Sequence, residues 1–155
     1  SFLTDTTDDD LKAIVKALEE KGDTDLNALL VDRHIEAKEI IEELGEDAQF
    51  AIDYLKRINA LLEGTPFKLG YRAANEALLY VSAAHQFDGS IDVNAALDEF
   101  TLMKILSRIE GDKRSIGNLL DDLQRVINDS YPSSNKKLVQ MAKTLQNKQF
   151  VSYWT

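Results

Sequence analysis

Cysteine is absent from this 155-residue sequence, and proline occurs only twice. Without cysteine there is no disulfide framework and no thiolate metal site, so a reducing cytoplasm is the expected location. Because prolines and glycines are few, helix breakers are rare and a helical chain is expected. No run approaches the ~18 apolar residues of a membrane span, and the first residues lack the features of a secretory signal. We therefore expect no membrane partner.

Catalytic and phosphate-binding signatures are also missing. The chain has no G-x-x-x-x-G-K-[ST] loop for nucleotide phosphates and no serine in a G-x-S-x-G turn. Its two histidines, His34 and His85, lack metal-ligand spacing. Adjacent acids such as Asp98 and Glu99 diverge by about 100° on a helix, which predicts solvated carboxylates. We expect no catalytic residue, no metal ligand and no cofactor bound by this chain alone.

Charge is unevenly distributed along the chain. The formal net charge of −9 argues against direct nucleic-acid binding by this chain. Residues 1–53 hold 16 acids and 5 bases, whereas residues 130–155 hold 4 lysines (Lys136, Lys137, Lys143 and Lys148) and no acid. This pattern predicts an acidic end and a basic end, or simply solvated helix faces.

Apolar residues recur at helical spacing along most of the chain. This periodicity predicts helices near residues 7–22, 25–44 (one or two), 46–63, 70–86, 92–110, 116–127 and 133–146. The expected fold class is all-α, a helical bundle of about six to eight helices. Residues 1–45 would form an acidic helical segment or insertion, and residues 46–155 the bundle. Met103 falls among the apolar helix positions, and we expect Phe150, Tyr153 and Trp154 to close the core.

The stretch Phe67–Glu76 opens the central helix. Pro66 and Gly70 end whatever precedes it, so Arg72 is expected in the first helical turn. Exposed N–H groups at a helix start favour anions, and a cation there is unfavourable unless an anion lies nearby. Arg72 is therefore either a solvated arginine whose stem packs on Tyr71, or one that holds an anion together with the helix end.

Four segments and the tail occur in an order and spacing that resemble the C-terminal helical lid of McrB-type AAA+ NTPases. These proteins are the motor subunits of modification-dependent restriction systems. The resemblance covers roughly residues 50–155 and rests on Ile58–Leu62, Leu69–Leu78, Leu97–Gly111, Tyr131–Met141 and Phe150–Trp154.

The resemblance implies an AAA+ lid-like fold and a role for particular residues. In that family an arginine opening a lid helix, the sensor-2 position, reaches the γ-phosphate; here that role falls on Arg72, with Gly70 and Tyr71 beside it. ATP or GTP with Mg would be bound by the full-length protein. The partners implied are a P-loop AAA+ core in the same polypeptide and neighbouring AAA+ subunits in a ring. Lys104 and Arg108, four apart on one helix face, are candidates for inter-subunit contact or are solvated.

One segment departs from the family pattern. Ser107 stands where the family has a proline, so we expect the helix to continue towards Gly111. Because no P-loop core is present in these residues, the resemblance implies a non-catalytic lid fragment that couples hydrolysis to domain motion. The alternative function is a free-standing acidic helical module that binds a basic protein.

Overall fold

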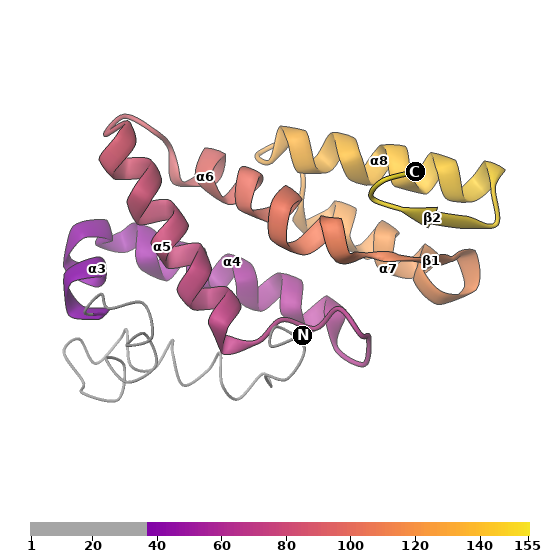
Figure 1. Ribbon diagram of the computed structural model, residues 1–155, viewed down its shortest axis with the longest axis horizontal. Helices are drawn as coiled ribbons and strands as arrows, with labels where there is room; N and C mark the ends of the chain where they lie inside the picture. Colours follow the sequence, from indigo (N-terminus) through magenta and orange to yellow (C-terminus); the bar gives the residue numbers. More distant parts are fainter. Residues whose placement is uncertain (1–36) are drawn as a thin grey trace. The chain divides into compact units, whose positions relative to one another are not determined.

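The protein is mostly helical, and the computed structural model describes residues 37–155 (Figure 1). These residues form six α-helices, a π-helix, a 3₁₀ turn and a two-stranded antiparallel sheet. They divide into two compact units, residues 37–93 and residues 94–155. The prediction of an all-α helical bundle is confirmed. Among the described residues, no helix has both the length and the apolar character needed to cross a membrane.

Three helices build the first unit: α3 (Ala37–Leu44), α4 (Glu46–Leu62) and α5 (Tyr71–Phe87), each packed on the other two. The sequence predicts an inward face of α4 with Phe50, Tyr54, Ile58, Leu61 and Leu62. Tyr54, Ile58 and Leu62 are buried as predicted, but Phe50 is 40% exposed and Leu61 is half-buried. The buried apolar side chains of α4 are Ala48, Ala51, Ile52, Tyr54, Leu55, Ile58 and Leu62. The buried face of α5 is rich in alanine (Ala73, Ala74 and Ala77), which permits a short distance between helix axes. The unit is therefore held by amphipathic helices that pack closely.

The predicted division after Gly45 stays a prediction. Gly45 adopts φ 57° between α3 and α4, a conformation that favours glycine. The Ser82 hydroxyl of α5 donates to the Glu43 carboxylate of α3 at 2.9 Å, so the described end of the acidic segment packs within the first unit. His34 and the helices predicted for residues 7–22 and for the beginning of 25–44 lie outside the described residues.

The second unit pairs α7 (Lys113–Val126) with α8 (Pro132–Asn147), which run alongside each other (Figure 1). Strand β1 (Glu110–Asp112) leads into α7, strand β2 (Phe150–Ser152) follows α8, and the two strands pair antiparallel with Gly111 opposite Val151. The sheet thus joins the start of α7 to the end of α8. The buried side chains of the second unit include Leu119, Leu120, Leu123, Leu138, Met141, Leu145 and Val151.

The helix predicted for residues 92–110 is instead three helices end to end. They are α6 (Val93–Phe100), the π-helix η3 (Thr101–Ile105) and the 3₁₀ turn η4 (Leu106–Arg108). Within them the Ser107 hydroxyl bonds the Met103 carbonyl at 2.6 Å, four residues back, a contact that competes with regular helix bonding.

The prediction that this helix continues towards Gly111 is wrong. Ile109 is extended, and residues 110–112 are taken up by pairing with β2. Gly111 adopts φ 156°, and a Cβ there would lie 3.0 Å from the Ile116 side chain. The helical conformation therefore continues past Ser107 to Arg108 and ends where strand pairing begins.

The predicted role of the aromatic tail in closing the core is also wrong. Phe150 is 52% exposed and Trp154 is 78% exposed, whereas Val151 between them is fully buried. A strand of three residues turns alternate side chains to opposite faces, so Val151 packs inward while Phe150 faces outward. Met103, predicted at an apolar helix position, is 50% exposed because the π-helix changes the phase of that helix.

Candidate functional site

The candidate site is the start of α5. Gly70 is buried and extended at the N-cap position, where it offers no side chain to cap the helix, and the first turn contains no acid. Tyr71 is the first helical residue, and the Arg72 side chain is exposed. The three residues predicted for nucleotide sensing therefore lie together at one helix start.

Buried contacts hold this helix start in place. The Asn59 side chain of α4, fully buried, accepts a hydrogen bond from the Leu69 N–H at 2.7 Å. Thr65 donates its hydroxyl to the Leu62 carbonyl at 2.7 Å and accepts the Phe67 N–H at 3.1 Å. Because Leu69 directly precedes the N-cap, the bond from α4 fixes the chain where α5 begins.

The electrostatics of the α5 start favour an anion. A helix N-terminus carries roughly half a positive charge, and Arg72 adds a full one with no acid in that turn. A bound anion would interact favourably with both the guanidinium and the helix start. A phosphate suits the site best, because the planar guanidinium can donate two parallel hydrogen bonds to its oxygens.

Lys104 and Arg108 lie in the second unit. The prediction that they share one helix face is wrong, because Lys104 belongs to the π-helix and Arg108 ends the 3₁₀ turn. Lys104 is exposed, whereas Arg108 is partly buried and its Nη1 has no hydrogen-bond partner among the described residues. Desolvation by burial lowers the pKa of Arg108, although an arginine remains protonated at neutral pH.

Replacing Arg108 with methionine should increase the free energy of unfolding by about 1 kcal/mol. Methionine keeps an unbranched stem and removes a buried donor that has no acceptor among the described residues. Urea denaturation measures the change, and Arg114→Met, at an exposed position of α7, is the control, expected within about 0.5 kcal/mol of the wild type. A loss of stability in Arg108→Met would mean that the guanidinium makes a stabilising contact.

Sequence reasoning missed the role of Asp98. The pattern predicts a solvated carboxylate, yet Asp98 is only 5% exposed. Its carboxylate accepts the Ser133 N–H at 2.9 Å and the Ser134 N–H at 2.8 Å, and the Ser134 hydroxyl donates to its carbonyl at 3.0 Å. Asp98 thus caps the start of α8 from α6, and α8 begins at Pro132 and not at a serine cap.

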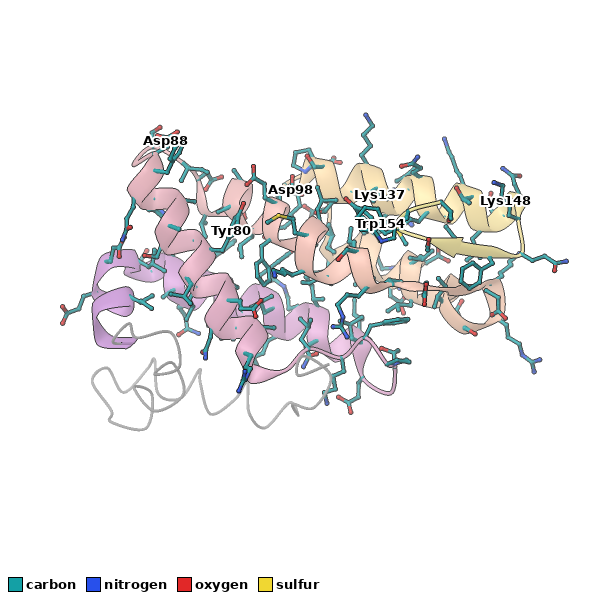
Figure 2. The ribbon with its side chains drawn as sticks, in the orientation of Figure 1. Tyr80, Asp88, Asp98, Lys137, Lys148 and Trp154 are labelled. Carbon is teal, nitrogen blue, oxygen red and sulfur yellow. The ribbon has the colours of Figure 1, made fainter. Side chains whose placement is uncertain are left out.

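The exposed tail makes contacts within itself and with α8. The Lys137 ammonium lies over the Tyr153 ring, 4.4 Å from its centre, and the Tyr153 and Trp154 rings meet edge-to-face with their centres 4.8 Å apart. Figure 2 labels Lys137 and Trp154. Ser152 accepts the Trp154 N–H at 3.2 Å and donates its own N–H to the Thr155 hydroxyl at 2.9 Å. The alternating aromatic tail was the only sequence signal for this arrangement.

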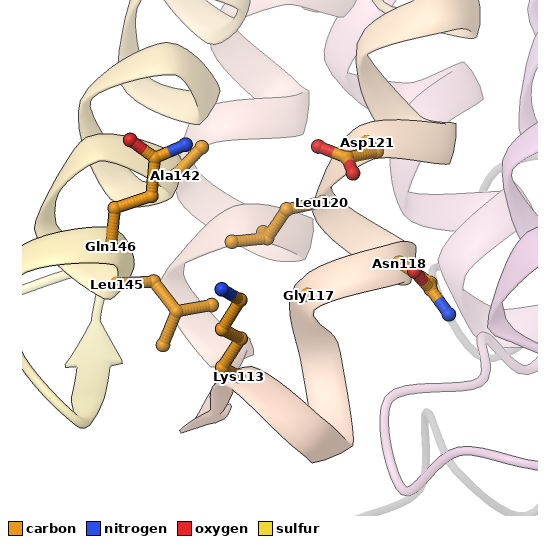
Figure 3. A pocket seen from close by; sticks show the side chains of 8 residues that line it. All are labelled: Lys113, Gly117, Asn118, Leu120, Asp121, Ala142, Leu145 and Gln146. Atoms are coloured by element: carbon orange, nitrogen blue, oxygen red, sulfur yellow. The ribbon is translucent and has the colours of Figure 1, made fainter.

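A groove lies between α7 and α8 (Figure 3). Its volume is about 140 Å³, and it is lined by Lys113, Gly117, Asn118, Leu120, Asp121, Ala142, Leu145 and Gln146. Typical ligand pockets measure roughly 300–1,000 Å³, so this groove is too small to be a candidate site. Within residues 37–155 no cluster of acidic and imidazole side chains is arranged to hold a metal ion.

Comparison with known proteins identifies a family. The family model described as "Domain of unknown function (DUF8727)" matches residues 28–150, which is most of the chain. The chain therefore belongs to this family. No curated protein and no solved structure matches it.

Proposed function

We propose that this chain is the helical lid of an AAA+ NTPase related to McrB-type restriction motors, and that Arg72 senses the nucleotide γ-phosphate. The observation that carries the proposal is the exposed Arg72 at a helix start with no side-chain cap and no acid in its first turn. Phosphate is the kind of anion that an exposed arginine and the N–H groups of a helix start can bind together.

Two observations support the proposal: the order of the motifs, and the buried hydrogen bond that positions the start of α5. The Asn59 bond to Leu69 holds the α5 start by a buried contact and not by a loose loop. A sensing arginine needs a fixed backbone position, because the hydrogen bonds from a guanidinium to a phosphate are directional. The P-loop core would supply the nucleotide pocket and the Mg²⁺ that neutralises its phosphates.

The proposed mechanism is conformational. With a triphosphate in place, Arg72 donates hydrogen bonds to the γ-phosphate oxygens and draws the lid towards the core. After hydrolysis and phosphate release these hydrogen bonds are lost, and the lid can move away. The α5 start thereby converts a change of charge in the nucleotide into a movement of helices.

The first test is the mass of the native polypeptide, measured by blotting source cells with an antibody raised against residues 1–155. We expect a band well above 17.4 kDa, with a P-loop encoded upstream, because a lid acts only beside a core. A band at 17.4 kDa would refute the motor proposal. The free-standing interaction module would then be the better interpretation.

A further inference from the structure

The C-terminal surface combines an exposed aromatic side chain with positive charge. We define it as Lys136, Lys137, Tyr153 and Trp154. Trp154 is the only tryptophan of the chain and is 78% exposed, yet its backbone is held by hydrogen bonds and its ring by Tyr153. Fixing a large aromatic side chain in water lowers the entropy that a binding partner would otherwise have to remove. Tryptophan is also enriched among the residues that dominate protein interfaces.

Positive charge lies beside the tail on α8, where the Lys137 ammonium is 4.4 Å from the ring centre of Tyr153. Residues 130–155 contain 4 lysines and no acid, and Lys136 is exposed beside Lys137. Across β2, the β1 residues Glu110 and Asp112 stand opposite Ser152 and Phe150. The positive part of the surface is therefore confined to α8 and the tail, so a partner must present its acidic groups to α8 and not to β1.

A complementary surface lies on α4 of the same chain. Glu46, Phe50 and Asp53 follow one another at i, i+4 and i+7 along one helix face, and all are exposed. Phe50 is 40% exposed, an unusual degree of exposure for a phenylalanine, and it lies between two carboxylates on the helix. Glu42 at the end of α3 is exposed as well, and one base, Arg57, lies a turn beyond Asp53. We call Glu46, Phe50 and Asp53 the α4 stripe.

We propose that the C-terminal surface of one copy binds the α4 stripe of a second copy, head to tail. Each surface supplies an exposed aromatic anchor, and the charges around the two anchors have opposite sign. Apolar burial and the attraction between lysines and carboxylates would together give the contact its affinity, and the charges would also set its orientation. Because the two surfaces differ, the contact is heterologous and repeats into a ring or a filament. The inference does not depend on nucleotide sensing by Arg72.

This chain itself carries the acidic surface that the lysines require. A second copy has the same charge of −9 as the first, so net charge opposes association of copies as well as binding of nucleic acid, and the contact depends on local attraction between the two surfaces. The same excess of acid, concentrated in residues 1–53, makes another copy of this chain a partner of the required sign.

Self-association is tested with the 155-residue chain by sedimentation and by Trp154 fluorescence over a wide range of concentrations. At low salt the average mass should rise with concentration, and Trp154 emission should shift to shorter wavelength as the indole leaves water. Both changes should be reversed in about 1 M salt, where the Debye length is ~3 Å. Trp154→Ala should weaken association at least about tenfold, as expected for an interface anchor.

Charge exchange provides the sharper test. The tail variant, Lys136→Glu with Lys137→Glu, and the stripe variant, Glu46→Lys with Asp53→Lys, should each be monomeric alone. Their mixture should associate again, although both variants remain net negative. A matched control, Lys113→Glu with Arg114→Glu on α7, makes the same change in net charge as the tail variant and should associate like the wild type.

Three results would overturn the proposal. The wild type could remain monomeric at low salt, the tail variant could associate normally, or the mixture of variants could remain monomeric. Quenching of Trp154 in the monomeric wild type by single-stranded oligo(dT), lost in the tail variant, would assign the surface to nucleic acid instead.

Discussion

Replacing Arg72 with alanine in the larger NTPase that we propose should reduce turnover about 100- to 1,000-fold. This is the usual loss when a donor to a developing phosphate or oxyanion charge is removed. The free energy of unfolding should stay within about 0.5 kcal/mol of the wild type, because Arg72 is exposed at a helix start that disfavours cations. Steady-state hydrolysis and urea denaturation of the same preparations give the two numbers.

Two further variants separate sensing from general charge. Arg72→Lys keeps the charge but not the planar fork, so its activity should fall between wild type and alanine. Arg57→Ala removes an exposed arginine from the middle of α4, away from any helix start, and should leave hydrolysis unchanged. Normal turnover in Arg72→Ala would remove the central residue of the proposed function.

Replacing Asp98 with alanine should cost about 2–4 kcal/mol of stability, a large share of the roughly 5–15 kcal/mol of a typical domain. The substitution leaves the N–H groups of Ser133 and Ser134 without their acceptor at the start of α8. It also removes a negative charge from the positive end of that helix. Urea denaturation followed by circular dichroism measures the loss.

Asparagine at position 98 and the neighbouring acid provide the controls for this prediction. Asp98→Asn keeps one acceptor oxygen and should lose about half as much as alanine. Glu99→Ala changes the adjacent, exposed acid and should stay within about 0.5 kcal/mol of the wild type. Equal losses at Asp98 and Glu99 would show that the cap contributes little and that α8 is held by packing alone.

Local patterns predict the first unit well. The apolar spacing along α4 indicates a helix from Glu46 that ends within one residue of the observed Leu62. Pro66 and Gly70 place the next helix start correctly, so Arg72 lies in the first turn, where the sequence predicts it. These features depend on residues a few positions apart, which a sequence pattern can reveal.

The second unit depends on contacts between distant residues. Asp98 caps a helix start 35 positions away, and nothing in its immediate sequence distinguishes it from a solvated acid. The sheet pairs two strands of three residues, too short to leave a clear alternating pattern. The burial of Val151 in place of Trp154 follows from that pairing, so the exposed tail could not be predicted either. For the candidate site, the residue pattern indicates the arginine but not its ligand.

The π-helix at Thr101–Ile105 has a consequence for how the gene can change in length. A π turn contains one more residue than an α turn, and here it lies between buried positions, with Met103 and Lys104 exposed between them. An in-frame deletion of one codon for residues 102–104 would convert it to a continuous α-helix without displacing Phe100 or Ile105 from the interior. Elsewhere in these helices the same deletion would rotate every following side chain by about 100°. This segment is therefore where the chain could lose one residue and keep its fold.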